Sequence, residues 1–293
     1  MAGYAVNAVA GPVERLLEQG TRTVTPFDVA DETGHLVWHV WGRGDPVVLL
    51  HGGAGSWRHW VRNIAALVHR GRRVLAPDLP GLGESSLPPK PYDPARVAGI
   101  VAAGLRQVLP PGVPCDLVGF SFGAIAAGHV AALHPAFVRT LALVGAGALG
   151  VARAQIDLVS VRDKDGSARE DANRTNLLRL MIADPARIDA LALSIQDWNA
   201  SRARVNSLGF ATSTLLLDQL RTVTCPIGAI WGEHDQVARP LLQDRIAALR
   251  SIRPDMPVEV VPTAGHWVAF EAADAFDLAL DHILDRLLGQ RRG

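Results

Sequence analysis

Cys115-Asp116-Leu117-Val118-Gly119-Phe120-Ser121-Phe122-Gly123 has the pattern of a strand that leads through a sharp turn into a helix. The apolar run ends at Val118, the next five residues fit G-x-S-x-G, and helix-forming residues follow at 124–127. Glycines on both sides of the serine let the helix pass close to the strand in such a turn. The stretch therefore predicts that Ser121 Oγ projects from the carboxyl end of a sheet, where it can attack a carbonyl carbon.

The same turn predicts part of an anion-binding site. Phe122 follows the serine at a helix N-terminus, so its backbone N–H is expected to face a developing oxyanion. A glycine-rich loop at residues 51–56 follows another apolar run. From this loop we expect Gly53 N–H as the second oxyanion donor and Gly52 in contact with substrate, while His51 packs and hydrogen-bonds to hold the loop. Each such donor typically contributes ~2.7–4 kcal/mol of transition-state stabilisation.

Length and composition describe a globular chain with a large core. Its 293 residues suffice for one large α/β domain or for a domain with an insertion, and 48% of them are hydrophobic against 20% charged. The 29 basic and 29 acidic residues balance, so neither nucleic acid nor an anionic membrane is expected as a partner. We expect a small-molecule substrate and a monomer or homodimer.

The cysteines and the N-terminal segment indicate the cellular compartment in which the protein is expected. Cys115 falls in an expected strand and Cys225 just before one, so both are expected to be buried thiols, which fits a cytoplasmic protein. Residues 1–20 lack a basic leader and carry three charged side chains, which predicts a short appended helix instead of a signal peptide. No apolar run approaches the ~20 residues that cross a bilayer.

Short apolar runs alternate with helical stretches along most of the chain. A hairpin is expected around the turn 31–34, because β-prone runs flank it. Further strands are expected at 46–50, 73–76, 140–144, 227–232 and 258–261, with helices at 57–69, 94–109, 240–250 and 269–288. This alternation predicts a mostly parallel sheet with helices on both faces.

No strand is expected between residues 147 and 221. This segment is charged, irregular and helix-favouring, with apolar residues at helical spacing between Ile188 and Trp198. We expect an inserted helical cap at 147–221 that covers the site and shapes what enters it. The core is then expected in two parts, 1–146 and 222–293.

The partners that a nucleophilic serine needs follow Ser121 in the chain. A serine in this turn is expected to be followed by an acid and then a histidine, each on a loop after a strand. Asp235 comes after the strand ending at Gly232, and His266 comes after the strand ending at Val261. His266 is expected to accept the serine proton and return it to the leaving group, while Asp235 orients the imidazole. Glu233 is the rival acid.

No other sequence pattern indicates a cofactor-binding site. Gly81-Leu82-Gly83 lacks the context of a dinucleotide-binding loop, and no cluster of histidine and cysteine has metal-ligand spacing. Asp78 and Ser85 are expected to fix the turns of their loop. We therefore expect neither a metal nor an organic cofactor.

Taken together, these motifs resemble the α/β-hydrolase fold family. The 51–55 loop, the 78–85 segment, the Ser121 turn, Asp235 and His266 stand in family order, and the resemblance runs from about Thr23 to the C-terminus. It implies the α/β-hydrolase fold with an inserted cap.

Within that family, the chain resembles capped bacterial hydrolases of aromatic ring-cleavage products and small-molecule esterases. The features that carry this are Trp267 after His266, the turn at 62–64 and arginines in the cap. The resemblance implies that Trp267 contacts substrate and that Arg202 or Arg204 binds a carboxylate. Carbon–carbon hydrolases of this group usually have asparagine before the nucleophile, where this chain has Phe120.

The function expected from the sequence is cofactor-free hydrolysis of a small, partly apolar carboxylic ester, acid monoesters and lactones included. Hydrolysis of a carbon–carbon bond in a vinylogous diketo acid is the alternative chemistry. A cofactorless oxygenase-type activity and a non-catalytic small-molecule receptor on the same fold remain open as well.

Overall fold

The computed structural model describes residues 11–153 and 155–290. The helix expected in the N-terminal segment is present as α1 (Gly11–Gln19), and the part of that prediction that concerns residues 1–10 lies outside the described residues. None of the helices in the described ranges is long and apolar enough to span a bilayer.

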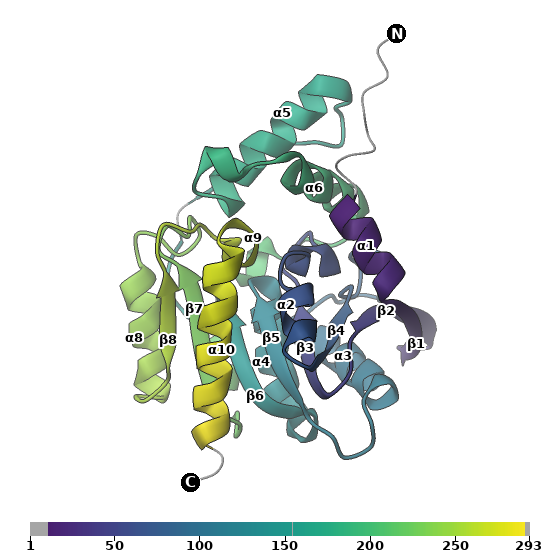
Figure 1. Cartoon of the computed structure of the whole chain (residues 1–293), viewed down its shortest axis with the longest axis vertical. Helices are drawn as coiled ribbons and strands as arrows, with labels where there is room; N and C mark the ends of the chain where they lie inside the picture. The colour runs from purple at the N-terminus through teal and green to yellow at the C-terminus, as the bar shows by residue number, and fades with distance from the viewer. Residues whose placement is uncertain (1–10, 154, 291–293) are drawn as a thin grey trace.

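The described strands form a single mixed sheet (Figure 1). Its eight strands lie in the order β1-β2-β4-β3-β5-β6-β7-β8, with β1–β2 and β2–β4 antiparallel and the other pairs parallel. Their bounds are β1 Thr21–Val29, β2 Glu32–Trp41, β3 Asp45–Leu50, β4 Arg72–Pro77, β5 Cys115–Phe120, β6 Val138–Val144, β7 Ile227–Gly232 and β8 Val258–Val261. The mostly parallel α/β sheet expected from the sequence is thus confirmed.

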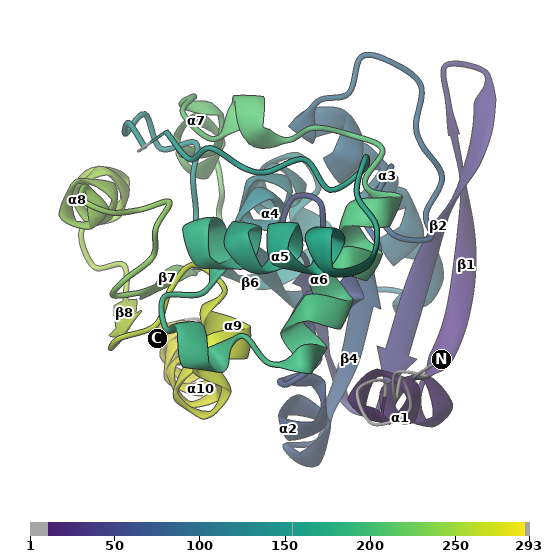
Figure 2. The ribbon, with the colours of Figure 1, turned by 90° about the horizontal axis from the view of Figure 1, so that it is seen from above.

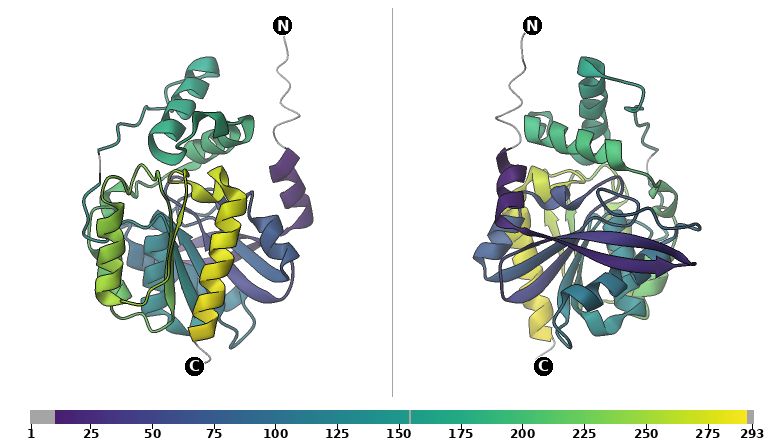
Figure 3. Two further views of the ribbon diagram at one scale, coloured as in Figure 1. Left: turned by 60° about the vertical axis from the view of Figure 1, so that its left-hand side comes forward. Right: turned by 90° about the vertical axis from the view of Figure 1, so that its right-hand side faces the viewer.

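Helices cover both faces of this sheet and enclose two apolar cores (Figures 1 and 3). One face carries α3 (Pro94–Val108), α4 (Phe122–Leu133), α7 (Leu215–Leu220) and α8 (Leu242–Ile252), and the other carries α2 (Ile64–His69), α9 (Val268–Glu271) and α10 (Ala273–Gln290). Every residue of β5 and of β7 is buried, as expected for central strands covered on both sides.

The strand order opens a crevice beside β3 and β5. The chain leaves β3 towards β4 on one side and leaves β5 towards β6 on the other, although β3 and β5 are neighbours. The loops after these two strands therefore diverge, and ligands of open α/β sheets bind at such a switch point. The glycine loop follows β3 and Ser121 follows β5, so topology alone brings them together.

The cap segment is residues 147–221, and its helices α5 and α6 lie above the carboxyl ends of the strands (Figures 1 and 2). It contains α5 (Gly166–Asn176), a π-helical turn at Leu177–Met181 and α6 (Ala190–Arg202). Its last helix, α7, packs against α4 instead, because Gly128 of α4 leaves space for the Leu216 side chain. The end of the expected cap thus belongs to the helix layer of the core.

The hairpin turn is shorter than the sequence indicated. Pairing continues to Val29 and Glu32, so the turn is formed by Ala30 and Asp31, both with positive φ. Such two-residue turns match the twist of the flanking strands. Gly34 lies inside β2 opposite Phe27, where a side chain would collide with the Phe27 ring.

Two expected helices are each divided in two. The 57–69 stretch consists of a 3₁₀ turn at Trp57–Trp60, capped by Ser56, and of α2, which starts at Ile64. The last helix is interrupted at Ala272, whose backbone leaves the helical region between α9 and α10. Asn63 and Asp277 join these two regions through a hydrogen bond of 2.9 Å from Asn63 Nδ2 to Asp277 Oδ1.

Replacing Asp277 by asparagine is expected to stabilise the protein at neutral pH. Burial raises the pKa of Asp277 to about 6, so the ionised carboxylate is disfavoured in the folded state. Because the pKa of Asp277 is higher in the folded state than in the unfolded state, the free energy of unfolding falls as pH rises from about 4 to about 6. Asp277→Asn keeps an acceptor for Asn63 without the charge. We expect about 1 kcal/mol more unfolding free energy at pH 7 and a flatter pH dependence, measured by urea denaturation. If the unfolding free energy of Asp277→Asn were instead about 1 kcal/mol lower than that of the wild type at pH 7, the negative charge of Asp277 would stabilise the fold.

Candidate active site

Ser121 sits in a strained turn between β5 and α4. Its φ of 53° and ψ of −114° lie outside the regions that side-chain-bearing residues favour. A Cβ on Gly119 would lie 2.3 Å from Gly123 O, and one on Gly123 would lie 2.3 Å from Leu50 O. Both glycines are therefore required by the close approach of helix and strand. Ser121 between them is partly buried and lines a cavity.

Ser121, His266 and Asp235 form a connected chain of hydrogen bonds. His266 Nε2 lies 3.0 Å from Ser121 Oγ, and His266 Nδ1 lies 2.8 Å from Asp235 Oδ2. Because an ionised carboxylate only accepts hydrogen bonds, this pairing assigns the proton of the neutral ring to Nδ1. Nε2 is then free to accept the serine proton, which is the arrangement that activates a serine nucleophile.

The carboxylate that reaches the histidine is held rigidly. Asp235 is fully buried, and its second oxygen, Oδ1, accepts hydrogen bonds from Val237 N at 2.8 Å and Ala238 N at 3.0 Å. The rival Glu233 points elsewhere, since its carboxylate accepts a hydrogen bond from Thr263 N. The structure thus places Asp235, and not Glu233, beside His266.

The two residues expected to donate backbone N–H groups to an oxyanion both lie beside Ser121. Gly53 and Phe122 line the cavity beside Ser121, and no hydrogen bond to either backbone N–H is found among the described residues. The first N–H groups of a helix have no partner within it, which leaves that of Phe122 available. Gly52 also lines the cavity, but its N–H donates to His59 Nδ1 at 3.3 Å. The hydrogen bond helps to shape the loop, and the position of Gly52 in the cavity wall is compatible with the substrate contact expected from the sequence.

His51 holds the loop, as expected from the sequence. It is buried, its Nδ1 donates to Gly52 O at 2.7 Å, and its Nε2 accepts from Leu79 N at 2.8 Å. Burial lowers its pKa to about 4, so the ring stays neutral at physiological pH. Asp78 likewise fixes the next loop through Trp57 N and Glu84 N, both at 2.9 Å.

A cavity of about 470 Å³ lies above these groups, between the core and the cap segment. Most of its wall is apolar, and the cap segment contributes much of it. The lining side chains include Phe120, Phe122, Ile125, Leu158, Leu180, Met181, Val205, Leu208 and Val237. Arg153 and Arg162 also line it and are its two cationic side chains. The cavity therefore suits a small, partly apolar molecule with an anionic group.

The arginines expected at the carboxylate lie elsewhere. Arg202 stacks its guanidinium on the Trp198 ring at 4.1 Å, and Arg204 donates to the backbone carbonyl of Ser85. Neither side chain lines the cavity, whereas those of Arg153 and Arg162 do. Position along the cap segment could not reveal this, because the path of the segment over the core decides which arginines face inward.

Trp267 is also displaced from its expected role. It is buried, its Nε1 donates to His59 O at 2.8 Å, and its ring stacks on Phe270 at 4.2 Å. Trp267 does not line the cavity. It supports the loop that carries His266 instead of contacting substrate.

One group of potential metal ligands is found among the described residues. It consists of His39, Asp78 and Glu84. Glu84 pairs with Arg22 at 3.7 Å, and Arg58 acts electrostatically on both carboxylates. Both carboxylates thus lie in the field of guanidinium groups, and Asp78 already accepts hydrogen bonds from two backbone N–H groups.

Comparison with known proteins agrees with this geometry. Residues 47–277 match the Alpha/beta hydrolase family, and because that is well over half of the chain, the chain belongs to this family. It is 28% identical over 258 residues to a 2-hydroxy-6-oxo-6-phenylhexa-2,4-dienoate hydrolase of Burkholderia cepacia, covering 83% of this chain and 88% of that protein.

Esterases are among its relatives too. The chain is 31% identical over 238 residues to a pimeloyl-[acyl-carrier protein] methyl ester esterase of Chromobacterium violaceum, covering 77% of this chain and 88% of that protein. A thermophilic esterase from Thermogutta terrifontis superimposes with a TM-score of 0.69 at 21% identity, over 91% of this chain and 99% of that one, which shows the shared fold. Relatives therefore include both carbon–carbon bond hydrolases and esterases.

Proposed function

We propose that this protein is a serine hydrolase that cleaves a small, partly apolar carboxylic ester through an acyl-enzyme on Ser121. The observation that carries the proposal is the chain of hydrogen bonds from Ser121 Oγ through His266 to Asp235, at 3.0 and 2.8 Å. His266 takes the serine proton and gives it to the leaving alcohol, and Gly53 with Phe122 binds the oxyanion. Water then hydrolyses the acyl-enzyme, with His266 as the base.

An acid monoester is the proposed substrate class within the esters. The apolar wall suits the chain of an acyl group, and the cationic side chains of Arg153 and Arg162 suit a carboxylate at its far end. The relative named as a methyl ester esterase supports the cleavage of an ester, which this substrate class requires.

Hydrolysis of a carbon–carbon bond in a vinylogous diketo acid is the second candidate. The relative from Burkholderia cepacia, whose name describes such an acid, and the same two arginines favour it. Phe120 weighs against it, because its apolar ring lies 5.0 Å from the His266 ring and offers no hydrogen bond to the substrate.

The experiment that tests the proposal combines labelling with a substrate panel. Intact-protein mass spectrometry after treatment with a fluorophosphonate is expected to show one adduct on Ser121. Turnover is then compared for p-nitrophenyl esters, acid monoesters and a ring-cleavage diketo acid. Turnover of the diketo acid alone would select the second candidate. If the protein shows no adduct and no turnover, both candidates are refuted. Base-only oxygen chemistry at His266 or ligand binding without reaction would then be examined.

Arg153 and Arg162 are expected to select acid monoesters over neutral esters. For Arg153→Ala and Arg162→Ala, we expect KM for a dicarboxylic acid monoester to rise by about tenfold or more, because a hydrogen bond between charged groups contributes about 1.5–3 kcal/mol. KM for the neutral ester of the same length should hardly change. Arg202→Ala is the matched control, because that side chain is exposed outside the cavity. Equal losses on both esters would rule out carboxylate recognition.

A further inference from the structure

Glu271 carries a buried carboxylate that no sequence pattern singled out. It is 5% exposed and lies at the end of α9, five residues after His266. Its Oε2 accepts from Gly265 N at 2.7 Å, its Oε1 accepts from Asp184 N at 2.7 Å, and Ala183 N donates to both oxygens at 3.0 Å. No ion pair found among the described residues includes Glu271, and the hydrogen-bond donors to its carboxylate are these backbone N–H groups.

The three donors come from two different parts of the chain. Gly265 immediately precedes His266, whereas Ala183 and Asp184 continue the cap segment just after its π-helical turn. Two residues of that turn, Leu180 and Met181, line the catalytic cavity. One carboxylate therefore fixes both the loop that carries His266 and the cap residues that form the cavity wall.

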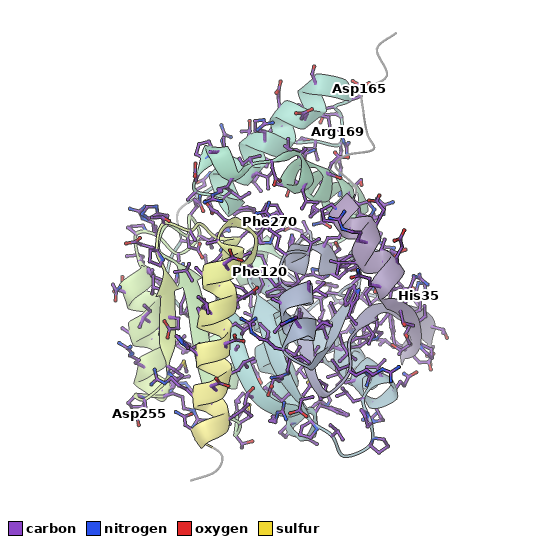
Figure 4. All side chains as sticks on the ribbon, in the orientation of Figure 1. His35, Phe120, Asp165, Arg169, Asp255 and Phe270 are labelled. Atoms are coloured by element: carbon purple, nitrogen blue, oxygen red, sulfur yellow. The ribbon has the colours of Figure 1, made fainter. Side chains whose placement is uncertain are left out.

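Neighbouring contacts make this junction tight. Trp267 N donates to Met181 O at 2.7 Å, so the residue after His266 is bound to the cap as well. A Cβ on Gly265 would lie 2.7 Å from Ala183 N, which shows how closely the two backbones approach. Phe270 marks this cap-facing end of the core in Figure 4, and α9 lies directly below the cap in Figure 1.

We propose that Glu271 is a positioning residue that couples the placement of the cap wall to the placement of His266. This inference rests on the proposed function, in which His266 Nε2 must stay within hydrogen-bond reach of Ser121 Oγ, now at 3.0 Å. Without the carboxylate, Gly265 N and the two cap N–H groups lose their shared acceptor, so the loop and the cap are held less tightly and can shift relative to each other. A displacement of about 1 Å in such a site can lower the rate by about 100-fold.

The kinetic test compares Glu271→Ala and Glu271→Gln with Glu233→Gln. We expect kcat for p-nitrophenyl acetate, per fluorophosphonate-titrated site, to fall about 10- to 100-fold in Glu271→Ala with little change in KM. Glu271→Gln should lie in between, because the amide keeps one acceptor oxygen. Glu233→Gln is the matched control: the Glu233 carboxylate accepts a hydrogen bond from Thr263 N on the same loop, but the residue is exposed, and no hydrogen bond from its side chain to the cap is found among the described residues. An unchanged kcat per site in a Glu271→Ala protein of lowered Tm would overturn the proposal, since only stability would then depend on Glu271.

Hydrogen–deuterium exchange tests the junction without relying on catalysis. In Glu271→Ala, peptides covering residues 178–190 and 262–270 are both expected to exchange at least about tenfold faster, because the donors of both lose the same acceptor. In Glu233→Gln only the second peptide should change, near Thr263. Faster exchange in the cap peptide alone would overturn the coupling. If wild-type protein hydrolyses no ester, the proposed function fails, and joint exchange of the two peptides still decides whether Glu271 links cap and loop.

Discussion

Ser121→Ala should reduce ester turnover by about 10⁴- to 10⁶-fold and abolish the fluorophosphonate adduct. The variant removes the oxygen that forms the acyl-enzyme but leaves the turn, the oxyanion N–H groups and the cavity in place. The measurement is kcat on the best ester of the panel, together with the intact mass after labelling.

The fold of this variant provides its control. Alanine has the same Cβ as serine, so the strain at φ 53° is unchanged and Tm should stay close to that of the wild type. An adduct that persists in Ser121→Ala, or turnover within tenfold of the wild type, would show that another nucleophile acts. A loss of turnover together with a strongly lowered Tm would instead point to a folding defect.

Asp235→Asn should lower kcat by about 10⁴-fold while leaving the fold intact. Val237 N and Ala238 N donate to Oδ1 at 2.8 and 3.0 Å, so the amide oxygen of asparagine takes that position and its NH₂ group faces His266. An NH₂ donor requires an unprotonated Nδ1, which moves the ring proton to Nε2. Nε2 can then no longer accept the serine proton, and the nucleophile is not activated.

Glu233→Gln serves as the matched control for this prediction. Glu233 lies two residues before Asp235 on the same loop, but its carboxylate binds Thr263 N and leaves His266 untouched. Its kcat should remain within about twofold of the wild type. A larger loss in Glu233→Gln than in Asp235→Asn would assign the orienting acid to Glu233 and contradict the geometry described above.

The strands and the nucleophile turn of the core could be predicted from the sequence because short stretches of residues specify them. The 227–232 and 258–261 strands have the bounds expected from their apolar runs. G-x-S-x-G forms its turn because Gly119 and Gly123 meet backbone atoms only a few residues away or on the adjacent strand. The order of strands then carries Asp235 and His266 to the same edge, since parallel strands end on one side of the sheet.

Contacts between residues on different elements were harder to predict. Gly34 is a glycine, which is typical of turns, but it lies inside a strand and faces the Phe27 ring across the hairpin. Trp267 follows His266 directly, yet it does not line the cavity, and its Nε1 donates to the backbone carbonyl of His59 on a different element. In both cases a partner on another element sets the role, and no local pattern encodes that partner.

The amino-acid sequence by itself determined the α/β architecture, the nucleophile turn and the order of acid and histidine, because hydrophobic period and backbone sterics act over a few residues. Only the tertiary structure decided that Arg153 and Arg162 face the cavity while Arg202 and Arg204 do not. It also decided that Glu271 binds two separate segments through their backbone N–H groups. Those contacts depend on how the cap segment packs on the core, and that packing is a sum of many weak long-range contacts that no single motif specifies.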